Sequence, residues 1–263
     1  MPTLILAALL AMPGCTAQKV SPEQSSPPPR LRVMGYNIHH GRGADDAIDL
    51  PRVADVINRA DVDLVALQEV DIRTRRSGGV DQLAELARLT NMHARFGKGR
   101  DFEGGDYGQA ILSRRPIASL EVHSLPPAND ADRRVALDAR IPGDATHPDV
   151  RFVGTHLHHV SEDFRAAQAQ RLIEILGDDA TVILTGDFNA IPGSPTMNLL
   201  LAPFADTIAD TALTYPASQP VKKIDWVVLP RGSRWRVAEG RVIDERIASD
   251  HRPVVVELQL APR

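Results

Sequence analysis

The sequence contains little of what several protein classes require. Cys15 is the only cysteine among 263 residues, which excludes a disulfide within the chain. Aromatic residues make up only 4% of the chain, and no stretch interleaves them with basic residues as proteins that stack single-stranded bases do. The net charge of −4 argues against a broadly positive surface for long nucleic acids, although a local basic cleft stays open. The composition therefore does not favour a general nucleic-acid binder.

What is present suffices for a large hydrophobic core. Hydrophobic residues form 43% of the 263 residues, a length that suits one large domain or two small ones. After residue 30, no Pro/Gly/Ser-rich linker, repeat or low-complexity tract divides the sequence. We therefore expect residues 31–263 to form a single domain.

The N-terminal part is typical of a targeting segment. An apolar run over residues 3–12 is too short to span a membrane, and Cys15 follows it directly after the small residue Gly14. This arrangement resembles the lipobox of bacterial lipoproteins, which implies a signal peptide over residues 1–15, a membrane anchor on lipidated Cys15, and export to the bacterial periplasm or cell envelope. A plain signal peptide, with Cys15 lost, is the alternative. Residues 16–30, rich in Pro, Ser and Gln, would form a flexible tether.

Residues 181–195 provide the first candidate site. A run of apolar and β-branched residues predicts a buried strand that stops at Gly186 and the turn residues beyond it. Side chains two apart in an extended chain share a face, so Asp187 and Asn189 are expected to point the same way. A carboxylate can deprotonate water or bind a cation, and an amide can donate to an oxyanion, which suits attack on phosphorus. The alternative is an Asx turn without function.

Polar side chains also stand at the ends of three other predicted strands. Asn37 and His39 end the first strand and share a face, and Glu69 and His156 end two later ones. Glu69 can supply a hard oxygen ligand for Mg²⁺, or it is simply the first exposed residue after its strand. A histidine such as His156 can equally be a surface or core residue. The three strands are expected over residues 31–38, 63–69 and 150–157.

The remaining elements have mainly structural signals. Capping residues and apolar spacing predict helices that begin near residues 49, 81, 161 and 194. The helix after Ser161 is expected to be purely structural. Arg73, Arg75 and Arg76 favour a solvated loop over a phosphate-gripping one. Further strands are expected over residues 107–113, 117–125, 134–141, 181–187, 224–229 and 253–260.

Seven short motifs occur in an order that resembles a known family. They are Tyr-Asn-Ile at 36–38, Leu-Gln-Glu-Val at 67–70, Tyr-Gly-Gln-Ala-Ile-Leu-Ser at 107–113, Gly-Thr-His-Leu at 154–157, Gly-Asp-Phe-Asn at 186–189, Ile-Asp-Trp-Val at 224–227 and Ser-Asp-His-Arg-Pro at 249–253. Over residues 31–260 the chain resembles the endonuclease/exonuclease/phosphatase superfamily of metal-dependent phosphohydrolases. The resemblance implies an α/β fold, a four-layer α/β/β/α sandwich of two mixed, mostly antiparallel sheets with helices outside. It also implies an active site across the tops of both sheets.

The same resemblance implies a metal site. Glu69 would hold Mg²⁺, or Mn²⁺, with Asn37 beside it and Asp250 nearby. The cation would neutralise the phosphate and the charge on the leaving oxygen. His39 departs from the pattern, because many nucleases of the family carry an acidic residue there, and this leaves a second metal site in question.

The resemblance also implies catalytic roles. Asp187 would orient or deprotonate the attacking water, and Asn189 and His156 would donate to the non-bridging phosphate oxygens. His251 would donate from the opposite side or act as an acid or base. Asp225 would fix the tautomer of a histidine, which the sequence does not identify.

The substrate stays open at this stage. Tyr107 would position the phosphate through its hydroxyl, unless it only packs. The family cleaves DNA, RNA, sphingomyelin, inositol phosphates and other esters, and the shared residues handle only the phosphate. A tethered, mildly acidic enzyme favours a small phosphodiester or a lipid headgroup, with an extracytoplasmic nuclease as the alternative. A lipid-anchored binding protein without catalysis is the alternative from another class. We expect a monomer.

Overall fold

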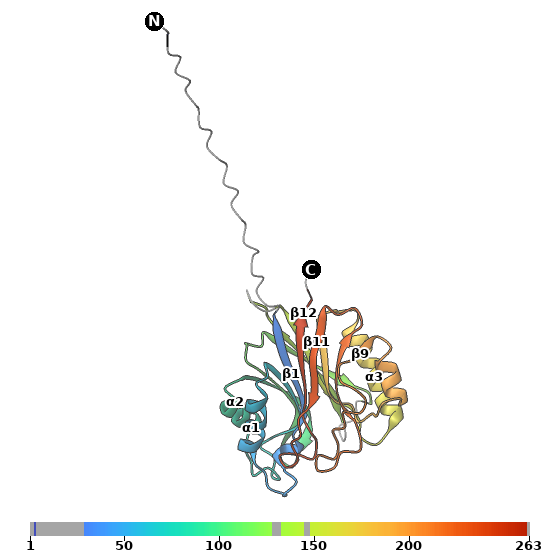
Figure 1. Ribbon diagram of the computed structural model, residues 1–263. Helices are drawn as coiled ribbons and strands as arrows, with labels where there is room; N and C mark the ends of the chain where they lie inside the picture. The colour runs from blue at the N-terminus through green and yellow to red at the C-terminus, as the bar shows by residue number, and fades with distance from the viewer. Residues whose placement is uncertain (1–2, 4–28, 128–132, 145–147, 262–263) are drawn as a thin grey trace.

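Two six-stranded sheets form the centre of the molecule (Figure 1). The computed structural model describes residues 3, 29–127, 133–144 and 148–261. Cys15, most of the predicted signal segment and most of the predicted tether lie outside the described residues, so both stay predictions. None of the helices within the described ranges is long and apolar enough to cross a membrane.

The first sheet has the strand order β11-β12-β1-β2-β4-β3. Neighbouring strands pair antiparallel except for β1 and β2, which are parallel. In sheet order the bounds are Trp235–Val242, Val254–Leu260, Arg30–Asn37, Leu64–Ile72, Gly105–Ser113 and His93–Phe102.

The second sheet repeats this pattern with the order β5-β6-β7-β8-β10-β9. Only its central pair, β7 and β8, is parallel among the described strands. In sheet order the bounds are Ser119–Leu125, Arg134–Ile141, Val150–His156, Val182–Asp187, Asp225–Pro230 and Phe204–Asp206. The prediction of two mixed, mostly antiparallel sheets is confirmed.

Helices cover the outer face of each sheet, as the capping signals predicted. Asp49 and Asp81 cap α1 (Leu50–Ala60) and α2 (Gln82–Thr90), and Ser161 and Ser194 cap α3 (Glu162–Leu176) and α4 (Pro195–Leu200). Each capping side chain accepts a backbone N–H of the first turn, which satisfies a donor that the helix itself leaves unpaired. Figure 1 shows α1 and α2 on one flank and α3 on the other.

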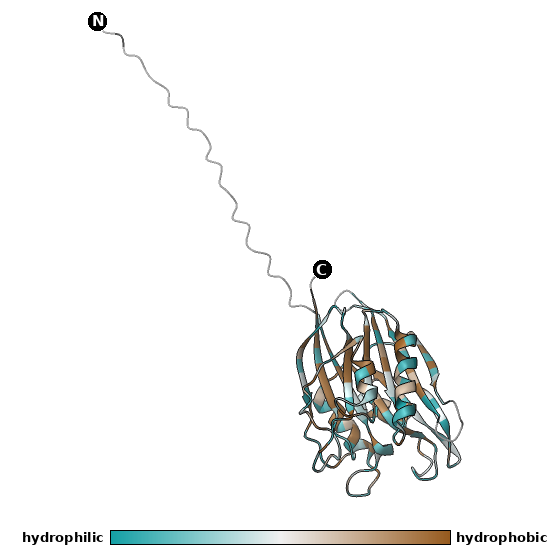
Figure 2. Ribbon diagram, turned by 90° about the vertical axis from the view of Figure 1, so that its right-hand side faces the viewer, coloured by the Kyte–Doolittle hydropathy of each residue, from teal (hydrophilic) through white to brown (hydrophobic). Residues whose placement is uncertain are grey.

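Three layers of buried side chains join the four layers of structure. One cluster fills the space between the sheets, with Phe152 and Ile183 facing Val33 and Ile111. A second lies under α1 and α2, and a third lies under α3 and α4. Figure 2 shows hydrophobic segments running through the strands and hydrophilic segments on the outward helix turns. The chain therefore folds as the α/β/β/α sandwich that the resemblance implied.

The parallel pairs direct polar residues to one edge of the sandwich. β1 begins beside the end of β12, where the Leu260 N–H donates to the Pro29 carbonyl, and runs to the opposite edge (Figure 1). There Asn37 at the end of β1 contacts Asp187 at the end of β8, in the other sheet. Both sheets therefore deliver side chains to the same place.

Candidate active site

Three of the predicted site residues lie in one row of the second sheet. His156 at the end of β7 pairs with Asp187 at the end of β8, and Asp187 pairs with Asp225 at the start of β10. Gly186 has a φ of 149°, and a Cβ on it would lie 1.9 Å from the carbonyl oxygen of Thr155. Only glycine fits there. The close approach of the Thr155 backbone therefore requires Gly186, the first residue of the Gly-Asp-Phe-Asn motif.

The buried carboxylate of Asp187 is held from two directions. Its Oδ2 accepts from Asn37 Nδ2 at 3.1 Å, and its Oδ1 accepts from the backbone N–H of Asn189 at 2.8 Å. The second bond is an Asx turn, and Asn189 has a φ of 49°, so the prediction of extended chain through residue 189 is wrong. Asn189 still lines the pocket. Its Nδ2 donates one hydrogen to the Leu157 carbonyl at 3.1 Å and keeps a second.

Asp225 holds His251, which answers the question that the sequence left open. His251 Nδ1 lies 2.9 Å and 3.2 Å from the two carboxylate oxygens of Asp225, and Nε2 lies 3.7 Å from Asp187 Oδ2. Burial lowers the pKa of His251, but the charges of Asp225 and Asp187 outweigh it and raise the pKa well above its ordinary value. The two carboxylates therefore favour the protonated ring, and Nε2 lies on the side of the site.

The pKa values of Asp187 and His156, the other two titratable groups of the row, shift in opposite directions. Burial raises the pKa of Asp187 above its ordinary value, although the charge of His251 lowers it. Burial, together with the charge of Arg134, holds the pKa of His156 well below the ordinary histidine value. His156 Nε2 lies 3.4 Å from Asp187 Oδ2. The row thus combines a carboxylate that accepts protons readily with a neutral imidazole that can donate one hydrogen bond.

Glu69 reaches the site from a β-bulge and not from a strand end. β2 continues to Ile72, and its pairing with β4 shifts between Leu67 and Val70, where Glu69 has a φ of 60°. The prediction that the strand ends at Glu69 is wrong for this reason. Glu69 Oε1 accepts from Asn37 Nδ2 at 3.1 Å. Asn37 therefore bridges the carboxylates of Glu69 and Asp187.

Two carboxylates of the site are suitable ligands for a divalent cation. Glu69 and Asp250 line the same pocket, and carboxylate oxygens are the ligands that Mg²⁺ and Mn²⁺ prefer. Asn37 turns its N–H groups to this space, because its Oδ1 accepts the backbone N–H of His39. Its role as a ligand therefore stays a prediction. His39 Nδ1 lies 3.7 Å from Asp250 Oδ1.

These residues line a pocket of about 950 Å³. The predicted residues in its wall are Glu69, Tyr107, His156, Asp187, Asn189, Asp250 and His251, with Asn37 and Asp225 directly behind them. Tyr107 lies beneath two guanidinium groups, those of Arg76 and Arg100, at 5.4 Å and 5.1 Å from its ring centre. Burial raises the pKa of Tyr107, so its hydroxyl keeps its proton.

The pocket also has basic residues, and only Arg76 among them was considered from the sequence for a role at the site, as the less favoured alternative of a phosphate-gripping loop. They are Arg76, Arg100, Arg134, Arg165 and Lys222. They come from the turn after β2, from β3, β6 and α3, and from the loop before β10, so no common motif could have grouped them. Arg165 lies in the first turn of α3, so this helix, predicted to be purely structural, also contributes a side chain to the pocket wall.

Arg76 is held in place by a buried carboxylate. Asp71 Oδ2 and Oδ1 accept from Arg76 Nε and Nη2 at 2.7 Å and 2.8 Å, and the side chain of Asp71 is fully buried. Thr74 and Ser77 donate their hydroxyls to the same carboxylate. The turn that the sequence assigned to solvent therefore fixes one cation of the pocket wall.

Replacing Asp71 by Asn is expected to lower the free energy of unfolding by about 2–3 kcal/mol at pH 7. The expected loss is smaller than the cost of breaking a fully buried ion pair, because the side chain of Arg76 is partly exposed. Burial raises the pKa of Asp71, but hydrogen bonds from Arg76, Ser77 and Thr74 outweigh it and lower the pKa below its ordinary value. The contribution is therefore complete above about pH 4 and is lost as the pH falls through the lower folded-state pKa.

Urea unfolding at pH 7 and pH 3 checks this prediction. The difference between the wild type and Asp71→Asn should shrink at pH 3. Asp101→Asn, which removes an exposed partner of Lys98, is the control and should cost less than about 0.5 kcal/mol. An equal difference at both pH values would contradict the assignment of the ion pair.

Comparison with known proteins finds one matching family model. The model described as "Endonuclease/Exonuclease/phosphatase family" matches residues 34–251. No curated protein matches the chain.

Solved structures share the fold over most of the chain. An endonuclease/exonuclease/phosphatase from Beutenbergia cavernae is 26% identical with a TM-score of 0.73, and the match covers 89% of this chain and 72% of that one. The mannosyl-6-phosphatase of Bacteroides thetaiotaomicron is 20% identical with a TM-score of 0.71, covering 87% and 99%. The human Nocturnin catalytic domain, solved with a sulfate anion, is 18% identical with a TM-score of 0.67, covering 89% and 94%.

Proposed function

Because the chain belongs to the endonuclease/exonuclease/phosphatase family, we propose that it is a phosphoester hydrolase whose Asp187 activates water against a small phosphodiester. The observation that carries the proposal is the buried Asp187 carboxylate, fixed by Asn37 and Asn189 between His156 and His251. A carboxylate fixed in this way can hold a water in one orientation and take its proton as the oxygen attacks phosphorus.

The neighbouring residues supply hydrogen-bond donors for the charge that develops on the phosphate. Neutral His156 donates one N–H, cationic His251 donates Nε2–H, and Tyr107 donates its hydroxyl. Asp225 keeps His251 charged and oriented through Nδ1. Donors that are already oriented stabilise a transition state without reorganising, which is why such an arrangement accelerates hydrolysis.

Glu69 and Asp250 would hold a divalent cation, Mg²⁺ or Mn²⁺, in this pocket. When bound, the cation neutralises charge on the phosphate and on the leaving oxygen. Hydrolysis of bis-p-nitrophenyl phosphate is therefore expected to vanish in EDTA and to return when Mg²⁺ or Mn²⁺ is added in excess. The release of p-nitrophenol measures it. Full activity in the chelator would contradict the metal assignment.

The size and charge of the pocket support a small, anionic substrate. Its volume of about 950 Å³ falls within the range of small-molecule sites, roughly 300–1,000 Å³. Five basic side chains in its wall suit a substrate with phosphate groups or a lipid headgroup. The same assay with p-nitrophenyl phosphate, phospholipids and plasmid DNA separates the diester from the monoester and from the nuclease alternative.

We also propose that the protein is exported and anchored through lipidated Cys15, on the basis of the apolar segment before it. Expressed in a bacterial host, the wild type is expected in the membrane fraction. Cys15→Ser is expected to stay uncleaved, because lipidation precedes removal of a lipoprotein signal. Fractionation followed by mass spectrometry of the N-terminus measures this. Equal soluble release of both forms would reject lipidation.

A further inference from the structure

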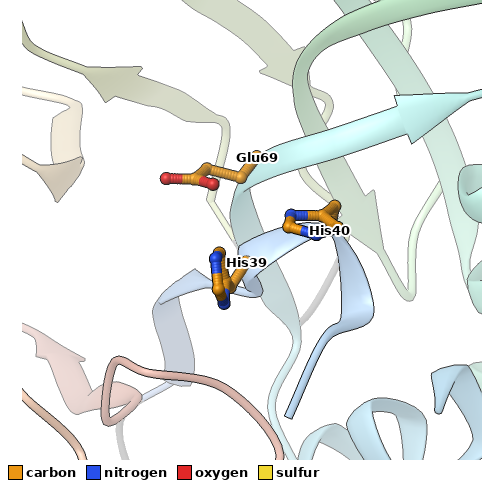
Figure 3. Close-up of side chains that lie close together, drawn as sticks. All are labelled: His39, His40 and Glu69. Carbon is orange, nitrogen blue, oxygen red and sulfur yellow. The ribbon is translucent and has the colours of Figure 1, made fainter. Parts of the chain in front are cut away.

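Two histidines and a glutamate converge on one side of the site. His39 and His40 form a short 3-10 turn, η1 (His39–Gly41), directly after β1, and Glu69 stands on the bulge of β2. One ligand atom from each residue lies within 4.8 Å of the others, and the side chains point toward a common space (Figure 3). The two imidazole rings lie 4.6 Å apart, centre to centre, at 74°.

The spacing leaves a modest closure to be made around a bound ion. Protein ligands stand about 2.0–2.2 Å from Zn²⁺, so in tetrahedral coordination two ligand atoms lie about 3.4 Å apart. Ligand atoms that lie within 4.8 Å of one another therefore need to close by up to about 1.4 Å. Side-chain rotation at His39, whose side chain is 30% exposed, can supply such a movement.

The buried ring of His40 has a nitrogen without a use in the fold. His40 is only 6% exposed, and its Nδ1 is buried without a hydrogen-bond partner among the described residues. Leaving a polar nitrogen unpaired away from water is costly, so such a group calls for a partner, and a bound ion is one of those that can satisfy it. A metal ion between the rings and Glu69 would give this side of the site a partner that the chain itself does not provide.

The backbone holds the three residues in place. Nine of the described non-glycine residues have a positive φ, and His39 (45°), His40 (46°) and Glu69 (60°) are all among them. Gln82 of α2 fixes the turn, because its Nε2 donates to the His40 carbonyl at 2.6 Å while its Oε1 accepts the backbone N–H of Asp71 at 3.0 Å. An uncommon conformation held in this way is typical of functional sites.

We propose that His39, His40 and Glu69 form a site for a first-row transition metal ion that accepts imidazole ligands, of the Fe²⁺, Co²⁺, Ni²⁺ or Zn²⁺ class. Two imidazole nitrogens and one carboxylate select such ions over Mg²⁺, which prefers oxygen ligands. Three protein ligands leave coordination positions open toward the pocket that Glu69 lines. The site shares Glu69 with the cation site of the proposed hydrolysis, so the two ions would compete for that carboxylate. The proposal goes beyond the hydrolysis in the two histidine ligands and the class of ion, and occupancy is measurable without any substrate.

Metal binding by the full chain tests the proposal. The protein carries no affinity tag and has Cys15→Ser as background, so that neither a tag nor a thiolate binds the ion. After EDTA treatment and dialysis, Co²⁺ is added and its visible absorption is recorded, and Zn²⁺ affinity is measured by calorimetry. We expect one ion per chain, a Co²⁺ spectrum typical of nitrogen ligands, and no displacement by millimolar Mg²⁺.

Variants of the two histidines identify the site. His39→Ala and His40→Asn are each expected to weaken Zn²⁺ binding by at least roughly 100-fold, since loss of a supporting partner alone costs about 10–100-fold. His93→Ala, at an exposed histidine on β3, is the control and should leave the affinity unchanged. Circular dichroism shows whether each variant folds. His39 is partly exposed, so its variant keeps the test valid if His40→Asn unfolds.

Two results would overturn the proposal. One is equal Zn²⁺ affinity in the histidine variants and the control, which would place the ion at Asp187, Asp225 and His251, the other group of this kind among the described residues. The other is Mg²⁺ binding that competes on equal terms. Neither result affects the proposed hydrolysis, which the Mg²⁺ assay tests separately.

Discussion

Asp187→Asn is expected to lower kcat by about 10²–10⁴-fold, with a smaller change in KM. Asn is nearly the same shape as Asp and can still accept the backbone N–H of Asn189, which Asp187 Oδ1 now accepts at 2.8 Å. It cannot take a proton from water. The loss should fall on kcat because the group acts mainly as the transition state forms. Steady-state kinetics with bis-p-nitrophenyl phosphate in saturating Mg²⁺ measure both constants.

Two controls make this prediction specific. Asp55→Asn, on the exposed face of α1, should leave kcat unchanged. The melting temperature of Asp187→Asn should stay within a few degrees of the wild type, because burial already disfavours the charged carboxylate. A folded Asp187→Asn protein with wild-type kcat would contradict the assignment of Asp187 as the group that activates water.

Much of this site could be predicted from the order of polar residues along the chain. Buried strands are near-continuous runs of apolar residues, so the first polar side chain after each run marks the edge of the sheet. Asn37, His156 and Asp187 are found at such positions, and Asp225 directly precedes the apolar run of β10. That these residues lie close together on neighbouring strands was implied by the family resemblance, because periodicity alone does not give the order of strands in a sheet.

The local backbone at the site could not be predicted in the same way. Glu69 and Asn189 both have left-handed φ values, one on a bulge and the other in an Asx turn. Glu69 bonds to Asn37, which is distant in sequence, and Asn189 combines the local bond to Asp187 with a bond from its side chain to the distant Leu157. Spacing in the sequence predicts a regular strand at each place, and the tertiary contacts prevail.

Three strands were also missed, and all three stand at sheet edges. β3 and β11 are mostly exposed or half-buried, and β9 has only three residues. An edge strand has one side open to solvent, so it needs neither an apolar run nor strict alternation. Arg100 belongs to β3, and its place in the pocket could therefore not be seen before the strand was found.

His251→Asn separates the two functions of the histidine. The Asn amide can occupy the position of Nδ1 and donate to Asp225, while the Nε2–H that faces Asp187 is lost. One such donor contributes on the order of 10²–10³ in kcat, so a loss of this size is expected. His251→Ala should lose similar activity and also melt at a lower temperature, because it leaves the buried Asp225 carboxylate without its partner.

Combining Asp187→Asn with His251→Asn should cost much less than the product of the two single losses. Independent effects would multiply to about 10⁴–10⁷ in kcat. The two residues are 3.7 Å apart and act on one transition state, so removing either leaves little for the other to stabilise. The kcat of the double variant should therefore approach that of the less active single variant. Multiplicative losses in the folded double variant would show that Asp187 and His251 contribute independently. Asp187 would then have to activate water without help from His251.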